Sequence, residues 1–174
     1  FTERLTTTAV QVAAAIDWLV EQKVDVINLS LGLRSDRDAL RTACERAVAA
    51  GVIVCASTPA RGDPVYPAAY PGVFRMTGDA RCNKSQISCL KTQYADFGGY
   101  VQGRNGVVGA SAGCAQMSGH IGRYLTEGGD SDPAAVNHWL QQQAEFFGAE
   151  VRFPVSEPNG AQTDGNQNNG DQDG

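Results

Sequence analysis

The sequence predicts a three-layer, doubly wound α/β domain, with a mainly parallel sheet and helices on both of its faces. Helical and strand patterns alternate through residues 8–56, and short connections join them. The 174 residues are 42% hydrophobic and 19% charged, which suits one globular domain with a sizeable core. We expect this domain to span residues 1–154.

The first helix–strand pair is expected over residues 8–31. Val12, Ile16 and Leu19 have the spacing of one helical face. Residues 24–31 are apolar and rich in β-branched side chains, which predicts a buried strand ending at Gly32.

The second pair repeats the pattern. Ser35 and Asp38 are expected to cap a helix that Gly51 ends, and residues 52–56 to form another buried strand. The apolar face of this helix comprises Leu40, Ala43, Cys44, Ala47 and Val48.

The remaining segments are less regular. Four prolines and two glycines in 58–72 predict an ordered loop. Residues 73–77 are expected to form a third strand, and residues 79–93 a polar excursion, that is, a polar segment outside the regular elements. Small residues after Ser111 predict a helix packed closely on other backbone. A last helix is expected to begin at Asp132-Pro133 and to turn Trp139, Leu140, Phe146 and Phe147 toward the core.

The chain closes on a Gly-, Asn-, Gln- and Asp-rich segment, residues 155–174, which we expect to be a disordered acidic tail. This tail carries Glu157, Asp164, Asp171 and Asp173 and no Lys or Arg, so it accounts for most of the net charge of −5. The rest has no basic stripe, so nucleic acid is not an expected partner. No apolar run reaches the length of a membrane span.

Five cysteines, three of them in apolar segments, predict reduced thiols in a cytoplasmic protein. The alternative is a secreted protein in which Cys82 pairs with Cys89 across a polar loop.

Four segments resemble subtilases in the order expected of that family. They are the helix and strand in 15–32, which includes DVINLSLG, the helix and strand in 47–56, the loop YPAAYPGV at 66–73, and Gly109-Ala110-Ser111. The resemblance covers roughly residues 9–125 and implies a subtilisin-like fold that is incomplete at its N-terminus.

The resemblance makes Ser111 the catalytic nucleophile. At a helix N-terminus, free backbone N–H groups and the helix dipole would stabilise an oxyanion beside it. Gly109 and Gly113 are expected to leave room for the substrate backbone. The alternative is that Ser111 only caps its helix.

The substrate-binding residues implied by the resemblance are Ser30, Leu31, Gly32, Ser57 and Gly109. An extended peptide is expected to pair with Ser30-Leu31-Gly32 by strand addition, and a side chain at Gly32 would block its approach. The alternative is a strand that simply ends in a turn glycine.

The triad is a first departure from the family. Subtilase triads run Asp, His, Ser along the chain, and the motifs for Asp and His are absent from this sequence, so we expect them in a segment preceding Phe1. His120 lies nine residues after Ser111, about 13 Å away on one helix, and His138 is expected on the last helix. Neither is a suitable base.

The oxyanion hole is a second departure. Ala60 occupies the position of the usual Asn, whose loss lowers the rate on the order of a hundredfold to a thousandfold. Thr58 could compensate. Arg61 would favour an acidic substrate residue, so replacing that residue from Glu to Lys should slow cleavage; a solvated loop arginine is the alternative.

These features predict a serine endopeptidase that removes a leader peptide from a precursor in the cytoplasm. The runs 78–82 and 109–115 resemble small subtilases of this kind, in particular the group attached to quinohemoprotein amine dehydrogenase maturation. The expected partners are a peptide or protein precursor and a modification enzyme, with no nucleic acid and no membrane. No cofactor or metal is expected. The rival is an inactive pseudopeptidase that binds an extended peptide.

Overall fold

The computed structural model describes residues 6–151, whose strands form one six-stranded sheet in the order β1-β2-β3-β5-β4-β6. In chain order the elements are α1 (Ala9–Glu21), β1 (Val26–Leu29), α2 (Asp38–Ala49), β2 (Ile53–Ser57), β3 (Phe74–Gly78), β4 (Ile87–Cys89), β5 (Phe97–Gly99), α3 (Ala110–Thr126), α4 (Pro133–Gln143) and β6 (Ala144–Phe147).

The sheet is parallel through β1, β2, β3 and β5. At the other end β4 runs antiparallel to β5 and parallel to β6. Strand β1 forms one edge, so its outer side has no neighbour within the described residues. The predicted doubly wound, mainly parallel α/β fold is confirmed.

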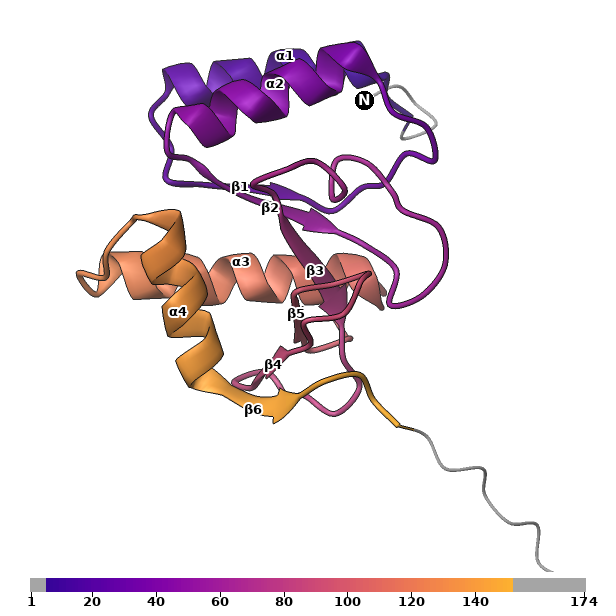
Figure 1. Ribbon diagram of the computed structural model, residues 1–174, viewed down its shortest axis with the longest axis vertical. Helices are drawn as coiled ribbons and strands as arrows, with labels where there is room; N and C mark the ends of the chain where they lie inside the picture. The colour runs from indigo at the N-terminus through magenta and orange to yellow at the C-terminus, as the bar shows by residue number, and fades with distance from the viewer. Residues whose placement is uncertain (1–5, 152–174) are drawn as a thin grey trace, which may run out of the picture.

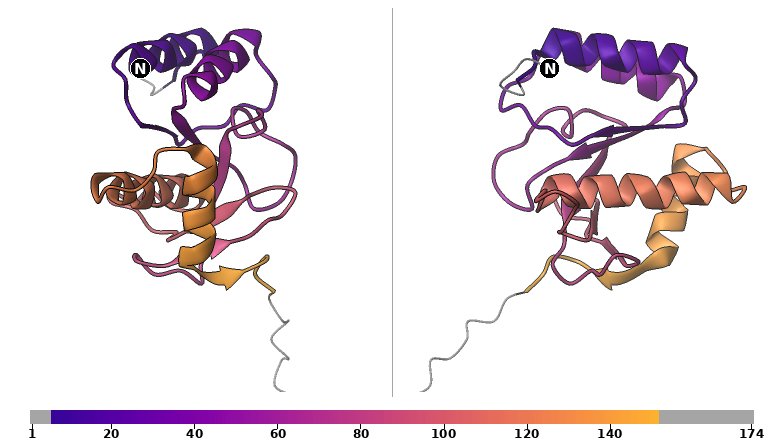
Figure 2. Two further views of the ribbon diagram at one scale, coloured as in Figure 1. Left: turned by 60° about the vertical axis from the view of Figure 1, so that its left-hand side comes forward. Right: turned by 180° about the vertical axis from the view of Figure 1, so that it is seen from behind.

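Helices cover both faces of the sheet. Helices α1 and α2 form a layer on one face, while α3 and α4 lie on the other (Figures 1 and 2). Successive side chains of strand β2 point alternately into the two cores, since a parallel strand in the middle of the sheet is buried on both faces. Val54 and Ala56 belong to the core under α1 and α2, and Ile53 and Cys55 to the core under α3.

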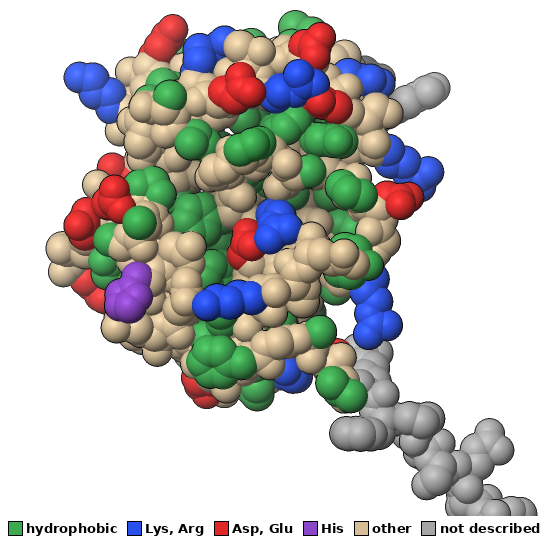
Figure 3. Space-filling view, in the orientation of Figure 1, with side chains coloured by type: hydrophobic (Ala, Val, Ile, Leu, Met, Phe, Trp, Pro, Cys, Tyr) green, Lys and Arg blue, Asp and Glu red, His purple; other side chains and the backbone are tan. Residues whose placement is uncertain are grey.

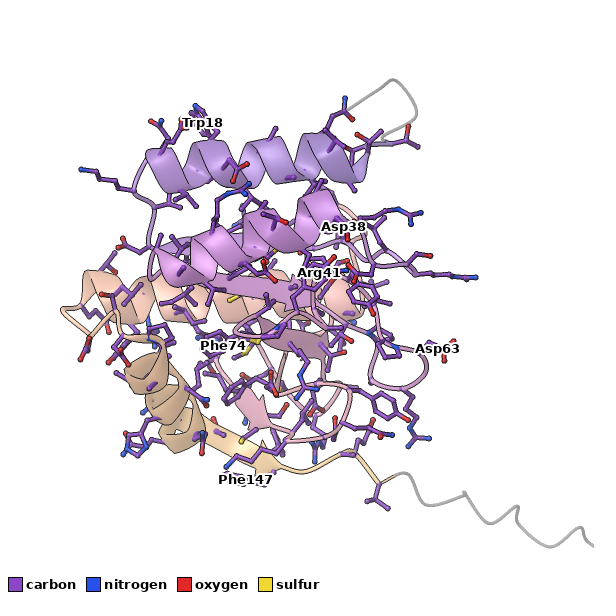
Figure 4. The ribbon with its side chains drawn as sticks, turned by 45° about the horizontal axis from the view of Figure 1, so that its top comes forward. Trp18, Asp38, Arg41, Asp63, Phe74 and Phe147 are labelled. Atoms are coloured by element: carbon purple, nitrogen blue, oxygen red, sulfur yellow. The ribbon has the colours of Figure 1, made fainter. Side chains whose placement is uncertain are left out.

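Helix α1 follows the predicted pattern. The Thr8 hydroxyl accepts from the Gln11 backbone N–H, and the Gln11 side chain accepts from the Thr8 N–H in a reciprocal capping box. Arg46 of α2 pairs with Asp17 of α1 at 2.7 Å, which joins the two helices. Trp18 is 58% exposed and points away from α2 (Figure 4).

The predicted Ser35 cap is wrong. Helix α2 begins at Asp38, and the preceding Arg37 makes no side-chain capping bond. Asp36 anchors this turn instead, because it pairs with Arg41 and accepts from the Tyr70 hydroxyl at 2.8 Å. Asp38 lies in the first turn of the helix, where its charge suits the helix dipole.

Two short strands were not predicted. Strand β4 lies within the expected polar excursion and β5 directly follows it, and every residue of both is buried. Strands of three residues are too short to show a period of two, so sequence pattern cannot find them.

The last helix begins as predicted, with Asp132 accepting from Ala134 and Ala135 and with Pro133 in its first turn. It ends at Gln143, however, so Phe146 and Phe147 lie on β6 rather than on the helix. Phe147 is 66% exposed, at the opposite end of the molecule from Trp18 (Figure 4). Leu140 is buried as expected, and Trp139 stacks on Tyr124 of α3 with ring centroids 4.4 Å apart.

All five cysteines are buried and unpaired, which agrees with the predicted reduced thiols and not with a Cys82–Cys89 disulfide. No helix among residues 6–151 is long and apolar enough to cross a membrane. Acidic and basic side chains interleave over α1 and α2 on the face shown in Figure 3. The expected tail, 155–174, lies outside the described residues.

Candidate active site

Ser111 is the second residue of α3, as the predicted nucleophile turn requires. The residue before the helix, Gly109, has φ of 73°, in the left-handed region that favours glycine. A Cβ there would meet nothing within 4 Å, so the backbone angle rather than space demands glycine. The Ser111 N–H lies in the first turn, where it has no intrahelical acceptor and is free to donate to a ligand.

The start of α3 rests directly on strand backbone. A Cβ on Gly113 would lie 2.1 Å from the Thr77 carbonyl oxygen, and one on Gly78 would lie 2.7 Å from the Gly109 oxygen. The expectation that Gly113 leaves room for substrate is therefore wrong, because β3 occupies that space. Gly113 instead sets the height of α3 above the sheet.

The side chain of Ser111 faces the end of β1. Its Oγ donates to the Ser30 carbonyl oxygen at 3.4 Å, and the Ser30 Oγ donates to the Ser111 carbonyl oxygen at 3.1 Å. Behind this pair, the Asn28 amide donates to the Ser30 Oγ at 3.0 Å. The Asn28 Oδ1 accepts from Cys114 Sγ at 3.2 Å and from Ser118 Oγ at 3.0 Å.

Sequence reasoning missed Asn28, Cys114 and Ser118 as parts of this site. A signal for them existed in the spacing. Positions 111, 114 and 118 share one face of a helix, and positions 28 and 30 share one face of a strand. Two polar rows that face each other between a strand and a helix predict a hydrogen-bonded network.

The predicted substrate segment gathers at the same place, beyond the carboxyl ends of β1 and β2. The Ser57 Oγ donates to the Leu31 carbonyl oxygen at 3.4 Å. The backbone of Gly32 makes no hydrogen bond to any residue of the described part, and a Cβ there would lie 3.4 Å from Val65. Ligands of open parallel sheets bind at this carboxyl end, so an added strand is compatible with the geometry.

The structure separates the residues expected around the oxyanion hole. Thr58 is 5% exposed, its N–H donates to the Met76 oxygen at 2.9 Å, and its hydroxyl donates to the Pro59 oxygen at 3.4 Å. Thr58 lines one cavity, of about 440 Å³, whereas Ala60 and Arg61 line another, of about 670 Å³. In the described structure the Thr58 hydroxyl is thus already engaged.

Arg61 is exposed and shares its cavity with acidic side chains. Asp79 is 5% exposed there and pairs with Arg81 at 2.7 Å. Burial raises the pKa of the Asp79 carboxyl, but hydrogen bonds from Arg81 outweigh that effect, and the net pKa is lowered. Glu150 lines the same cavity. The acidic preference stays a prediction.

Neither histidine is placed to activate Ser111. His120 lies on α3 with Ser111, is 8% exposed, and its Nε2 is 3.5 Å from the Gln116 amide nitrogen. Burial, together with the charge of Arg123, lowers the pKa of His120 and keeps its ring neutral. His138 is exposed on α4. Residues 6–151 contain no group of three His, Cys, Asp or Glu side chains that could hold a metal ion.

Fold and site together define a doubly wound α/β domain that presents a serine at a helix N-terminus beside an edge strand. The model of the subtilase family matches residues 3–88. The chain is 28% identical over 138 residues to the minor extracellular protease Epr of Bacillus subtilis, covering 74% of this chain and 21% of that protein. It is 44% identical over 68 residues to the major intracellular serine protease of the same organism, covering 35% of this chain and 21% of that protein. Residues 3–88 of the chain are thus similar to the subtilase family.

Solved structures agree on the fold. The patellamide maturation protease PatA superposes with a TM-score of 0.58 at 18% identity, over 80% of this chain and 60% of that one. The prenylagaramide maturation protease PagA superposes with a TM-score of 0.56 at 18% identity, over 79% of this chain and 58% of that one. The chain thus spans about a fifth of the length of these two curated relatives and less than two thirds of these solved chains.

Proposed function

We propose that the chain supplies the nucleophile and part of the substrate-binding strand of a subtilisin-like serine endopeptidase. The observation that carries the proposal is the placement of Ser111, with its N–H in the first turn of α3 and its Oγ against the Ser30 carbonyl at the end of β1.

The chemistry follows from that placement. A base removes the Oγ proton, Oγ attacks the peptide carbonyl, and first-turn N–H groups stabilise the negative oxygen that forms. The base is proposed to be a histidine oriented by an aspartate, both from sequence that precedes Phe1. Within the described residues, the hydrogen-bond partner of Ser111 Oγ is a carbonyl oxygen, which holds the proton without activating the serine.

The proposed substrate is a precursor protein, from which the enzyme removes a leader peptide in the cytoplasm, next to a modification enzyme. Two solved structures of this fold are named maturation proteases, which supports this role. The free Gly32 backbone supports an extended peptide, because such a peptide binds through main-chain hydrogen bonds.

The second candidate is a pseudopeptidase that binds an extended peptide without cutting it. The engaged Thr58 hydroxyl and the alanine at position 60 favour it, since neither side chain offers a free donor to an oxyanion.

The test is the intact mass of the natively expressed protein before and after treatment with a fluorophosphonate probe. We expect a mass above the 18.4 kDa of these residues and one adduct, which Ser111→Ala abolishes and exposed Ser131→Ala retains. A mass near 18.4 kDa without an adduct would replace the peptidase with the peptide-binding candidate.

A further inference from the structure

We propose that Asn28 is a positioning residue for Ser111. The proposal rests on the peptidase function above and assigns to Asn28 a role that the resemblance did not give it. One side-chain amide joins strand β1 to helix α3, because it is bonded to Ser30 on one side and to Cys114 and Ser118 on the other.

The nitrogen end of the amide fixes the direction of the Ser30 hydroxyl. That hydroxyl has one hydrogen, which goes to the Ser111 carbonyl oxygen at 3.1 Å. Its oxygen can accept a hydrogen bond in turn, and the Asn28 Nδ2 donates one to it at 3.0 Å. The Asn28 N–H thus keeps the Ser30 hydroxyl pointed at the nucleophile's own backbone.

The oxygen end fixes the rotation of α3 about its axis. Cys114 and Ser118 lie three and seven positions beyond Ser111 on the same helical face. Cys114 Sγ donates to Asn28 Oδ1 at 3.2 Å, and the single hydroxyl hydrogen of Ser118 is shared between Asn28 Oδ1 and the Cys114 carbonyl oxygen, each 3.0 Å away. Burial raises the pKa of the Cys114 thiol to about 12, so the thiol keeps its hydrogen at neutral pH and remains a donor. With donors on this side and an acceptor on the other, the amide has one satisfied orientation.

The expected consequence is kinetic. A displacement of about 1 Å in a reacting group can slow a reaction on the order of a hundredfold. A purely stabilising role would instead lower the free energy of unfolding and leave the reactivity of the folded protein unchanged.

Asn28→Asp separates the two roles. The substitution keeps the shape and the acceptor for Cys114 and Ser118 but places a carboxylate oxygen against Ser30. The Ser30 hydroxyl then turns its hydrogen to the new carboxylate and releases the Ser111 carbonyl. We expect the maximal rate of fluorophosphonate labelling at Ser111 to fall about ten- to a hundredfold, with the half-saturating probe concentration unchanged. The matched Asn137→Asp, on the exposed side of α4, should label within about twofold of the wild type.

The backbone gives a second measurement. In Asn28→Asp, amide hydrogen exchange at residues 113–115 should become faster than in the wild type, because the start of α3 has lost its hydrogen bond from the Ser30 hydroxyl. If Asn28→Asp does not fold, Ser118→Ala, which removes one donor to the same amide, is measured in its place.

The outcomes separate this proposal from the peptidase function. If the folded variant labels as fast as the wild type, the positioning role is overturned. If the wild type itself fails to label, the peptidase proposal fails and exchange alone decides. Faster amide hydrogen exchange at residues 113–115 in Asn28→Asp then supports the role of Asn28 in holding α3 against β1, and unchanged exchange overturns it.

Discussion

The two faces of strand β1 make different kinds of contact. Ile27 and Leu29 are buried in the apolar core under α1 and α2. Asn28 and Ser30, which alternate with them, face α3 and hydrogen-bond to it. One side of β1 is thus wholly apolar, whereas the side toward α3 begins with the apolar Val26 and becomes polar at Asn28 and at Ser30, which follows the strand.

The difference is one of directionality. Burial of apolar surface stabilises in proportion to area and needs no particular angle. A hydrogen bond weakens steeply when its angle is wrong, so it fixes orientation although its net contribution is only about 0.5–1.5 kcal/mol. Substitutions on the two faces should therefore produce different signatures.

The largest effect on stability is expected on the apolar face of β1. Leu40 of α2 is fully buried in the core that this face of β1 helps to form, so Leu40→Ala should lower the free energy of unfolding by about 2–5 kcal/mol in urea denaturation. Labelling of Ser111 per folded molecule should stay within about twofold of the wild type. Exposed Val10→Ala is the control and should change stability by less than about 0.5 kcal/mol. Slower labelling in folded Leu40→Ala would mean that the two faces are coupled.

A smaller loss of stability with a larger change at the site is expected from Gly113→Ala. The new Cβ would lie 2.1 Å from the Thr77 oxygen, which forces α3 away from β3 at about 1–3 kcal/mol. The shift moves Ser111, so labelling should slow as well. Gly119→Ala on the same helix meets nothing within 4 Å and should be neutral or stabilising, by up to about 1 kcal/mol. Equal stabilities for the two variants would contradict the close packing.

The smallest expected effect is a pH dependence of the free energy of unfolding, which arises from His120 on α3. The pKa of His120 lies below 6.5 in the folded chain because of burial and Arg123, so the unfolded chain binds the proton more readily. Stability should therefore be complete above pH 6.5 and decline as the pH falls from there toward the folded pKa. His120→Gln should flatten this decline in denaturation curves between pH 7 and pH 5, whereas exposed His138→Gln should retain it. A slope unchanged by His120→Gln would assign it to other groups.

The sequence predicted the long elements well because their patterns are periodic. Helix α1 lies where the apolar spacing places it, α3 follows the run of small residues after Ser111, and α4 begins at the predicted Asp132 cap. It failed at β4, β5 and β6, since these short strands lack the long apolar, β-branched run that marked β1 and are defined by their neighbours in the sheet. Phe146 and Phe147 were placed on a helix for the same reason.

At the site, Ser111 and the segment after β1 were predictable, because a motif fixes each of them locally. The bond from Ser57 to Leu31 was not, since it depends on which strand ends meet. For Asn28 the only signal was the shared spacing of positions 28 and 30 with 111, 114 and 118. Gly113 shows the limit most clearly. Its sequence position suggested space for a ligand, and only the three-dimensional structure shows that the Thr77 carbonyl fills that space.

Backbone contacts set the distance between the start of α3, which carries Ser111, and the sheet. Carbonyl oxygens lie within 3.1 Å of where Cβ atoms on Gly78, Gly99 and Gly113 would be, so the main chains of β3, β5 and α3 nearly touch. The position of the Ser111 backbone over the sheet therefore depends on three residues that have no side chain, and a methyl group at any one of them would push α3 and the sheet apart.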